Sequence, residues 1–402
     1  MPLHSHTTKL PHRFHQIRTF INARIKWVRD PYLDFAVQRE KDLKQAISLK
    51  NQILSTPSKS LSLSTASLLK PHLNLPTSTS NFSLKYPSLF TQFHTPPHLH
   101  LTPQALALHK EESSIYNSPT HRNDAVRRLA KLLMLTRASK LPLYIIDRLK
   151  WDMGLPHNYI STLLSDYPDY FQVCEVRDEA SGEEVLGLEL VSWREDLAVS
   201  ELERRVGIYG DLGRKKGMRI SFPMCLTKGF ELEKKVRDWV EEWQALPYIS
   251  PYENAFHLSP NSDQAEKWAV AMLHELLWLL VSKKMEKENV FCLGEYLGFE
   301  GRFKKALVHH PGIFYVSNKI RTQTVVLREA YRKDFLVEKH PLMGMRYRYI
   351  HLMNKVPKKK PRKQGVGLAS GAKRQVALTA SGEGVERKKE MWVRWWGEWC
   401  DW

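Results

Sequence analysis

The sequence predicts a mainly α-helical protein with small β-hairpins, an α+β fold in which helical units broken by proline recur three times. Two observations predict it. Apolar residues recur at helical spacing over much of the chain, and one short motif occurs in three copies. The motif is an aromatic residue or His, then Pro, any residue, a bulky apolar residue and Phe. Its copies are Tyr86–Phe90, Tyr167–Phe171 and His310–Phe314. Because Pro biases the preceding residue away from the α region, each copy should end a short helix and start an extended segment.

The elements before the second motif are expected to be helical. Over Asp34–Ile53 apolar residues recur at helical spacing among charged residues, which predicts a charged helix with one apolar side. Leucines among the Ser and Pro residues of 55–83 predict short helices joined by breaks. Asn123 or Asp124 can cap the next helix, and a further helix follows over Leu143–Trp151.

After the second motif, hairpins and long helices alternate. A polar turn that contains Gly182 predicts a β-hairpin, and prolines separate two long amphipathic helices. A helix pair and a second strand pair then surround the third motif. The expected ranges are Phe171–Val176 with Val185–Val191, Phe230–Leu246, Ser262–Lys287, Leu293–Val308, and Phe314–Val316 with Val325–Leu327.

Length and composition exclude several classes of protein. The chain has 402 residues, of which 42% are hydrophobic, so it can bury a substantial core in one domain or in two lobes with a break near 195–225. It contains no run of about 20 apolar residues that could span a membrane. Its four cysteines are far apart and form no C-x-x-C pair, so neither a zinc site nor a disulfide framework is expected.

Motifs that suggest catalysis are incomplete. His274-Glu275 opens like a zinc-protease helix, but the required second His would stand at the position of Trp278. His309-His310 has no carboxylate or Cys at ligand spacing, and the glycines of 207–217 are not followed by Gly-Lys-Ser/Thr. No clustered Asp/Glu metal site supports a nuclease. We therefore expect no catalytic residue, no cofactor and no metal site.

Positive charge is concentrated toward the ends of the chain. The formal net charge is +18, and residues 30–299 are nearly neutral overall. Residues 1–29 carry basic residues without an acid in an amphipathic pattern, which is typical of an organelle transit peptide; a basic surface helix is the alternative. Ser and Thr are sparse at the start of the chain, which favours a mitochondrion over a chloroplast. The run from Lys355 to Lys363 is rich in Lys, Arg and Pro, and it predicts disorder and sequence-independent affinity for nucleic acid.

Three clusters combine basic and aromatic residues. Binding of unpaired RNA requires cations for the phosphates and flat rings on which bases stack, and each cluster offers both. The first is Arg214, Lys215, Lys216 and Arg219, beside Tyr209 and Phe222. The second is Arg302, Phe303, Lys304 and Lys305, with Lys319 and Arg321. The third is Arg328, Tyr331, Arg332 and Lys333, then Arg346, Tyr347, Arg348 and Tyr349. A solvated basic face is as good an interpretation of any one cluster, so the RNA-binding prediction rests on their sum.

Several ordered blocks resemble the plant organelle RNA recognition (PORR) domain. They span about residues 26 to 353. The blocks are Lys26–Asp34, Leu141–Leu143, Gly154–Pro156, Tyr167-Pro168 with Phe171, His310–Ser317, Val326–Tyr331 and Pro341–Met343. The resemblance implies a nuclear-encoded plant protein that enters mitochondria or chloroplasts, binds organellar RNA and supports group II intron splicing, with intron transcripts and other splicing factors as partners.

The resemblance and the charge pattern together predict a domain organisation. We expect a transit peptide over 1–29, an RNA-binding domain over 30–353, a basic, Gly/Ser-rich linker over 354–390 and a Trp-rich tail over 391–402. Two alternatives remain at this point. Helices with basic faces also suit an organellar DNA-binding factor in transcription, and the tail also suits an adaptor that recruits a partner protein.

Overall fold

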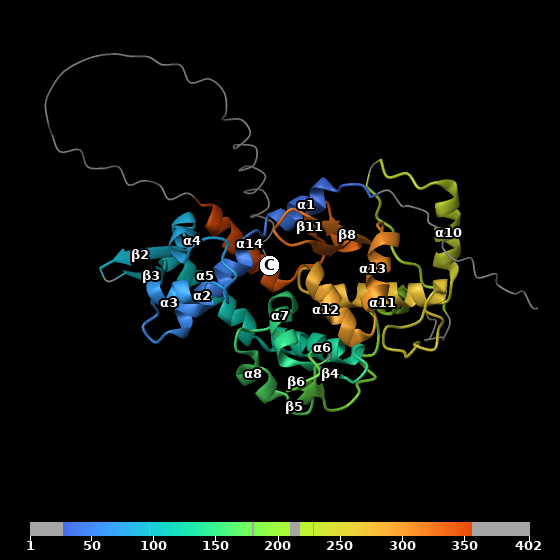
Figure 1. Ribbon diagram of the computed structural model, residues 1–402, viewed down its shortest axis with the longest axis horizontal. Coiled ribbons are helices and arrows are strands. Elements are labelled where there is room, and N and C mark those ends of the chain that lie inside the picture. Colours follow the sequence, from blue (N-terminus) through green and yellow to red (C-terminus); the bar gives the residue numbers. More distant parts are fainter. Residues whose placement is uncertain (1–26, 96, 179–180, 210–217, 228, 356–402) are drawn as a thin grey trace, which may run out of the picture. The chain divides into compact units, whose positions relative to one another are not determined.

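The computed structural model describes residues 27–355, except residues 96, 179–180, 210–217 and 228. These residues belong to one compact unit (Figure 1). The transit peptide is expected over residues 1–29, and residues 1–26 of it lie outside the described residues. So do Arg214, Lys215 and Lys216, the basic linker from residue 356 onward and the Trp-rich tail.

One arrangement of elements occurs three times along the chain. Each copy, which we call a repeat, has a helix, a short strand, two further helices and a β-hairpin. The first repeat contains α2 Leu43–Ser55, β1 Leu61–Ser62, α3 Leu63–Leu68, α4 Thr79–Lys85, β2 Phe90–His94 and β3 Pro97–Leu101. The second contains α6 Pro119–Leu135, β4 Lys140–Pro142, α7 Leu143–Met153, α8 Tyr159–Thr162, η1 Leu164–Asp166, β5 Phe171–Arg177 and β6 Glu184–Leu190. The third contains α11 Asp263–Trp278, β7 Lys284–Glu286, α12 Lys287–Leu297, α13 Glu300–His309, β8 Phe314–Ser317 and β9 Thr324–Leu327.

The remaining elements connect the repeats or cover them. They are α1 Pro31–Gln38, α5 Pro103–Asn117, α9 Glu201–Tyr209, α10 Lys234–Ala245, η2 Arg328–Ala330, β10 Tyr331–Arg332, β11 Phe335–Leu336 and α14 Pro341–Asn354. The fold is thus mainly helical with small antiparallel sheets, which confirms the predicted α+β class (Figure 1).

The three-stranded sheets of the repeats have the same strand order and the same register. In each, the short first strand pairs with the last strand, which gives the orders β1-β3-β2, β4-β6-β5 and β7-β9-β8. The motif Phe starts the second strand of each repeat, which lies at an edge of its sheet, and it pairs with a Leu of the central strand. These pairs are Phe90 with Leu101, Phe171 with Leu190, and Phe314 with Leu327. All six side chains are buried, so the same contact closes the core of each sheet.

The residue before each motif Pro ends a helix, as predicted. Tyr86, Tyr167 and His310 are the C-caps of α4, η1 and α13, and their φ and ψ angles are −121° and 62°, −129° and 54°, and −120° and 57°. The carbonyl of each accepts a hydrogen bond from the N–H of the motif Phe, at 3.1, 3.2 and 3.0 Å. The motif therefore builds one backbone turn three times.

Left-handed residues also recur at equivalent positions. Lys59, Ser139 and Lys283 have positive φ and each stands two residues before the buried residue of the short first strand. Asn74, Gly154 and Gly298 have positive φ between the second and third helices of each repeat. This second set of left-handed residues makes the helix-turn-helix of each repeat, because a residue in that region ends a helix.

Several element boundaries differ from the sequence prediction. The helix expected over Asp34–Ile53 is divided into α1 and α2 because Asp42 is left-handed, with φ 64°. The helix expected over Ser262–Lys287 ends at Trp278, and the left-handed Lys283 leads into β7. Ser118, not Asn123 or Asp124, caps α6, and its hydroxyl accepts from the His121 N–H at 3.3 Å.

Apolar residues form two main cores. The first repeat packs with α14, which contributes residues such as Tyr349 and Ile350 and lies beside α5 (Figure 1). The second and third repeats share the other core with α1, and the indole rings of Trp243 and Trp268 are fully buried in it. Among the described residues, no helix is long and apolar enough to cross a membrane.

Candidate nucleic-acid interface

Each repeat carries a helix-turn-helix followed by a β-hairpin, the element order of winged helix-turn-helix units. In helix-turn-helix proteins that bind nucleic acid, the second helix of the motif presents its outer face to the ligand. The corresponding helices here are α4, α8 with η1, and α13. Their outer faces can therefore be compared directly.

Basic residues occupy this face in the third repeat. Gly301, Lys304, Lys305 and Val308 are exposed at helical spacing along α13. The outer residues of α4 are Asn81, Leu84 and Lys85, and Lys85 pairs with Asp42 at 2.7 Å. Those of α8 and η1 are Ile160, Ser161, Ser165 and Asp166. Of these three described helices, α13 presents two adjacent exposed lysines.

Aromatic rings lie beneath the basic side chains of α13. The Arg302 guanidinium is half-buried over the Phe299 ring, at 5.5 Å, and its Nη1 has no hydrogen-bond partner among the described residues. Burial lowers the pKa of Arg302. The Lys304 ammonium lies 5.4 Å from the Phe291 ring, and Lys305 donates to Asn261 at 3.3 Å. Lys304 and Lys305 are exposed, whereas Nη1 of Arg302 is buried.

Phe303 does not lie on the surface with its neighbours. Its side chain is fully buried in the core of the third repeat, where it stacks on Phe299 with ring centroids 5.5 Å apart. A base cannot stack on a ring in that position. The exposed face of α13 therefore offers cations for phosphates without an aromatic platform.

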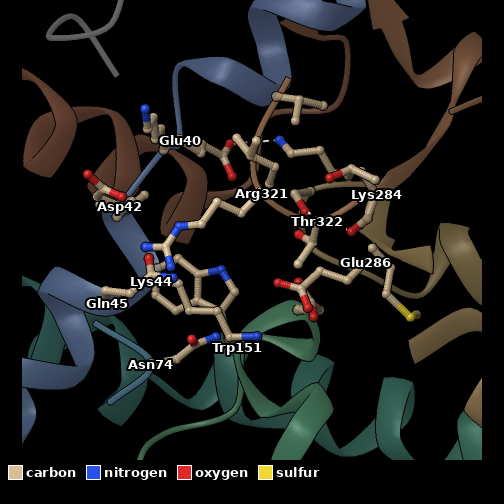
Figure 2. Close-up of a pocket in the computed structure, with 18 residues that line it drawn as sticks. Glu40, Asp42, Lys44, Gln45, Asn74, Trp151, Lys284, Glu286, Arg321 and Thr322 are labelled. Carbon is tan, nitrogen blue, oxygen red and sulfur yellow. Dashed lines mark hydrogen bonds and ion pairs between the residues drawn. The ribbon is translucent and has the colours of Figure 1, made fainter. Parts of the chain in front are cut away.

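The loop after β8 adds two further exposed cations. Lys319 lies 3.9 Å from the Asp34 carboxylate, which weakens its availability to another anion. Arg321 points into a pocket (Figure 2) and has no hydrogen bond or ion pair among the residues that the structure describes.

Arg328 of the third predicted cluster is an interior residue. It is 4% exposed, donates to Asp30 at 2.8 Å and lies 4.9 Å from the Tyr315 ring. Burial lowers its pKa, and the Asp30 carboxylate opposes that effect. Tyr331 is buried as well. Arg328 therefore stabilises the interior of the fold and does not lie on a surface that RNA could reach.

Arg346 has a similar place. Its guanidinium stacks 3.9 Å from the Trp151 ring and donates to the Trp151 carbonyl, and the side chain is buried. Tyr349, three residues further along α14, is also buried. The Arg39 guanidinium lies over the Tyr347 ring, 4.7 Å from its centroid. Arg346 therefore joins α14 to the end of α7.

The remaining members of that cluster lie at the surface. Arg332 and Lys333 are exposed. Arg348 is half-buried and forms an ion pair with Glu111. In the first cluster Arg219 is exposed, but Phe222 is buried and stacks on Trp243 with centroids 5.5 Å apart. The predicted cations that the structure leaves exposed thus lie mostly in the third repeat and the segment after it.

The apparent metal motifs are internal contacts. His274 Nε2 donates to Glu329 at 2.7 Å, and Glu275 accepts from Tyr252 at 2.8 Å. His309 and His310 both contact one oxygen of Glu266, at 2.9 Å. Glu266 is distant in sequence, so spacing along the chain could not reveal it. Against the effect of its burial, the two His contacts lower the pKa of Glu266 to about 2.

One cluster has ligand atoms close enough for a metal ion. The nearest ligand atoms of His121, Asp124 and His340 lie within 4.8 Å of one another. His340 Nδ1 accepts the Leu342 N–H at 3.2 Å, so in the neutral ring Nε2 carries the hydrogen and faces Asp124 at 3.5 Å. Arg128 already pairs with the same carboxylate at 2.8 Å. The cluster is arranged as a hydrogen-bonded contact between α6 and α14, and this arrangement does not favour a cation.

The fold defines the class: a protein of three helix-turn-helix repeats, whose third repeat has two exposed lysines on its outer helix. The chain belongs to the plant organelle RNA recognition domain family, which it matches over residues 28–358. The predicted family is thereby confirmed, and it places the chain among organellar RNA-related factors.

Curated plant proteins are similar over most of their length. "Protein WHAT'S THIS FACTOR 9, mitochondrial" of Arabidopsis thaliana is 36% identical over 84% of this chain and 87% of its own. "Protein WHAT'S THIS FACTOR 1, chloroplastic" of Zea mays is 30% identical over 87% of this chain and 70% of its own. "Protein ROOT PRIMORDIUM DEFECTIVE 1" of Arabidopsis thaliana is 30% identical, with 83% and 84% covered. No solved structure matches the chain significantly.

Proposed function

We propose that this protein is a mitochondrial RNA-binding factor that promotes group II intron splicing by binding intron RNA and favouring its active fold. The observation that carries the proposal is the exposed Lys304-Lys305 pair on the outer helix of a chain in the plant organelle RNA recognition family. The similarity to a relative named as mitochondrial supports that compartment, and the chloroplast is the alternative.

The proposed role needs no catalytic residue in the protein. A group II intron carries out its own chemistry, so a protein acts by binding the competent RNA fold more tightly than misfolded forms. A difference of about 3 kcal/mol in binding free energy changes the ratio of the two forms about 150-fold. In this role Lys304, Lys305 and Arg302 contact phosphates of the RNA. Such contacts supply affinity that does not depend on the RNA sequence.

A second candidate is an organellar DNA-binding factor. The helix-turn-helix followed by a hairpin favours it, because that arrangement suits a duplex groove. A-form RNA has a deep, narrow major groove that a helix does not enter, whereas the B-DNA major groove admits one. The two candidates therefore differ in their preferred nucleic acid, and a third, the adaptor, differs in needing the Trp-rich tail.

Recovery of bound nucleic acid from organelles tests these candidates. The tagged full chain is immunoprecipitated from isolated mitochondria, and bound RNA and DNA are sequenced. Enrichment of one or a few intron-containing transcripts is the expected result. Recovery of organellar DNA without RNA would replace the splicing proposal by the DNA-binding one, and recovery of a protein partner alone would favour the adaptor.

A further inference from the structure

Two aromatic rings lie at the surface on the outer face of α1. Tyr32 is 52% exposed and Phe35 is 45% exposed, and they stand three residues apart on the helix. Side chains at that spacing share one face of a helix, with about 5 to 6 Å between their Cβ atoms. The opposite face of α1 is buried through Leu33, Ala36 and Val37. The two rings therefore form an aromatic surface that solvent reaches, which we call the α1 platform.

The β10–β11 hairpin brings cations to the platform. Lys333 lies in the turn between the two strands with φ 59°, and its ammonium is 6.0 Å from the centroid of the Tyr32 ring. Arg332, the residue before it, is exposed as well. Neither side chain forms an ion pair among the residues that the structure describes. Both cations are thus open to an anion beside the rings.

The acidic groups around the platform already have basic partners. The acids of α1, of the hairpin and of the segment that follows it are Asp34, Asp334 and Glu338, and their partners are Arg29, Arg39 and Lys283, at 2.8, 3.2 and 2.7 Å. Asp34 is buried and Asp334 is mostly buried. In this described part of the chain the surface of α1 and the hairpin is therefore positive, and it favours an anionic partner.

The fold holds the Phe35 ring in place from the protein side. The Arg39 guanidinium lies 5.9 Å from the Phe35 centroid, and it also contacts the rings of Phe335 and Tyr347. Arg39 is almost fully buried, so this contact leaves the solvent side of Phe35 open. A ring that is positioned before binding loses little conformational entropy when a flat ligand stacks on it.

Exposed rings beside cations suit unpaired RNA. Every base has a flat face that stacks on an aromatic ring whatever the sequence, and neighbouring cations bind the phosphates. Bases inside a duplex already stack on one another, so only unpaired bases can lie on such rings. Lysine is depleted from protein–protein interfaces, so Lys333 beside Tyr32 favours a nucleic acid over a protein partner.

We propose that the α1 platform stacks unpaired bases of the bound RNA while Arg332 and Lys333 contact the adjacent phosphates. The inference rests on the proposed RNA-binding function, to which it adds a surface that selects single strands. It also supplies the exposed rings that the outer face of α13 lacks. Neither Tyr32 nor Phe35 belongs to the clusters predicted from the sequence.

The test measures binding of the full chain to short single-stranded RNA by fluorescence anisotropy. One oligonucleotide is unmodified, and a second has the same length and charge but lacks the bases of its central nucleotides. Both offer the same phosphates, so a difference in affinity reports stacking. We expect the abasic oligonucleotide to bind about tenfold more weakly, a loss that stacking of one base on an aromatic ring accounts for.

A double variant removes the rings without changing the charge. Tyr32→Leu/Phe35→Leu keeps apolar side chains at two exposed positions, so it should fold. It should bind the unmodified RNA about tenfold more weakly than the natural protein does and bind the two oligonucleotides equally. The slope of log K against log salt should stay the same, because no phosphate contact is lost. Phe93→Leu is the matched control, since that ring is 57% exposed on β2 of the first repeat, and its RNA binding should not change.

The outcomes separate the platform from the general function. Equal binding of the two oligonucleotides by the natural protein, or a preference that survives in Tyr32→Leu/Phe35→Leu, would overturn the platform while RNA binding by α13 stands. The same holds if the variant keeps its RNA affinity but loses a protein that the natural chain recovers from mitochondria, which would assign the surface to that protein. Failure of the natural protein to bind either oligonucleotide would overturn the RNA-binding proposal and the platform together. If the double variant does not fold, Tyr32→Leu decides the question with the same two oligonucleotides.

Discussion

Arg328 donates a hydrogen bond to the Asp30 carboxylate at 2.8 Å, and this contact ties the start of α1 to the end of β9. Asp30 also caps α1 by accepting from the N–H groups of Tyr32 and Leu33. Tyr315 donates to Asp34 at 2.9 Å on the same side of the helix. Residues about 300 positions apart thus form one buried polar network, and α1 is part of the third repeat's support.

Arg328→Ala should therefore destabilise the fold without a direct effect on RNA contacts. Loss of one member of a buried ion pair leaves the other charge uncompensated, which costs about 3 kcal/mol or more. Urea denaturation measures the change in free energy of unfolding. The matched control is Arg332→Ala, an exposed residue for which a change within about 0.5 kcal/mol is expected. Equal stability of the two variants would contradict the assignment of Arg328 to the interior.

Charge reversal on α13 tests the phosphate-binding face. The double variant Lys304→Glu/Lys305→Glu should lower RNA affinity and reduce the dependence of that affinity on salt. Each phosphate contact to single-stranded RNA contributes about 0.7 to the slope of log K against log salt, so the loss should be about 1.4. Titrations at several salt concentrations give the slope.

A second double variant controls for the change in net charge. Lys234 and Lys235 are adjacent exposed lysines on α10, outside the repeats. Lys234→Glu/Lys235→Glu makes the same change in total charge and should leave the slope nearly unchanged. If both double variants had the same effect, long-range charge rather than contact by α13 would explain RNA affinity.

The three-fold motif was predictable because its cause is local. Pro disfavours the α region for the residue before it, and Tyr86, Tyr167 and His310 each end a helix. The short strands β1, β4 and β7 were not predicted, because each pairs with a strand far along the chain and has only two or three residues. Non-local pairing leaves little signal in so short a segment.

The candidate site was predictable only in part for a related reason. Basic and aromatic residues adjacent in sequence separate on a helix, so Lys304 is exposed while Phe303 is buried. The same spacing argument could not show that Arg328 and Arg346 have interior partners, since Asp30 and Trp151 are distant in sequence. Tyr32 and Lys333 are distant in sequence as well, so no local pattern indicates the α1 platform.

Gly154 tests the helix-turn-helix of the second repeat. Its φ is +65°, and a Cβ there would lie 2.7 Å from Val281 Cγ2 and 2.8 Å from Leu342 Cδ1. Gly154→Ala should therefore cost the left-handed strain of about 1 to 2 kcal/mol and a further packing cost of similar size. Gly182 is the matched control, with φ +73° and open space around the added Cβ. Gly182→Ala should cost the strain alone, and equal losses in thermal or urea denaturation would contradict a packed turn at Gly154.

His121 makes stability depend on pH. Burial lowers its pKa from the ordinary 6.5 to about 4, and the charges of Arg128 and His340 add to the shift. Between those pH values the unfolded chain binds a proton at His121 that the folded protein does not. Stability is therefore complete above about pH 6.5 and falls as pH drops toward 4, by about 2 to 3 kcal/mol from this group.

The variant His121→Leu isolates that contribution. It cannot titrate, so its free energy of unfolding should fall less steeply between pH 6.5 and 4 than that of the natural protein. The pKa of His340 is also lowered, so part of the slope should remain. Asp124, whose pKa is lowered to about 2, loses its stabilising charge only below this window and does not account for the slope. Urea denaturation at a series of pH values gives both curves. Parallel curves would show that His121 binds its proton equally in the folded and unfolded states, which its burial between α6 and α14 does not allow.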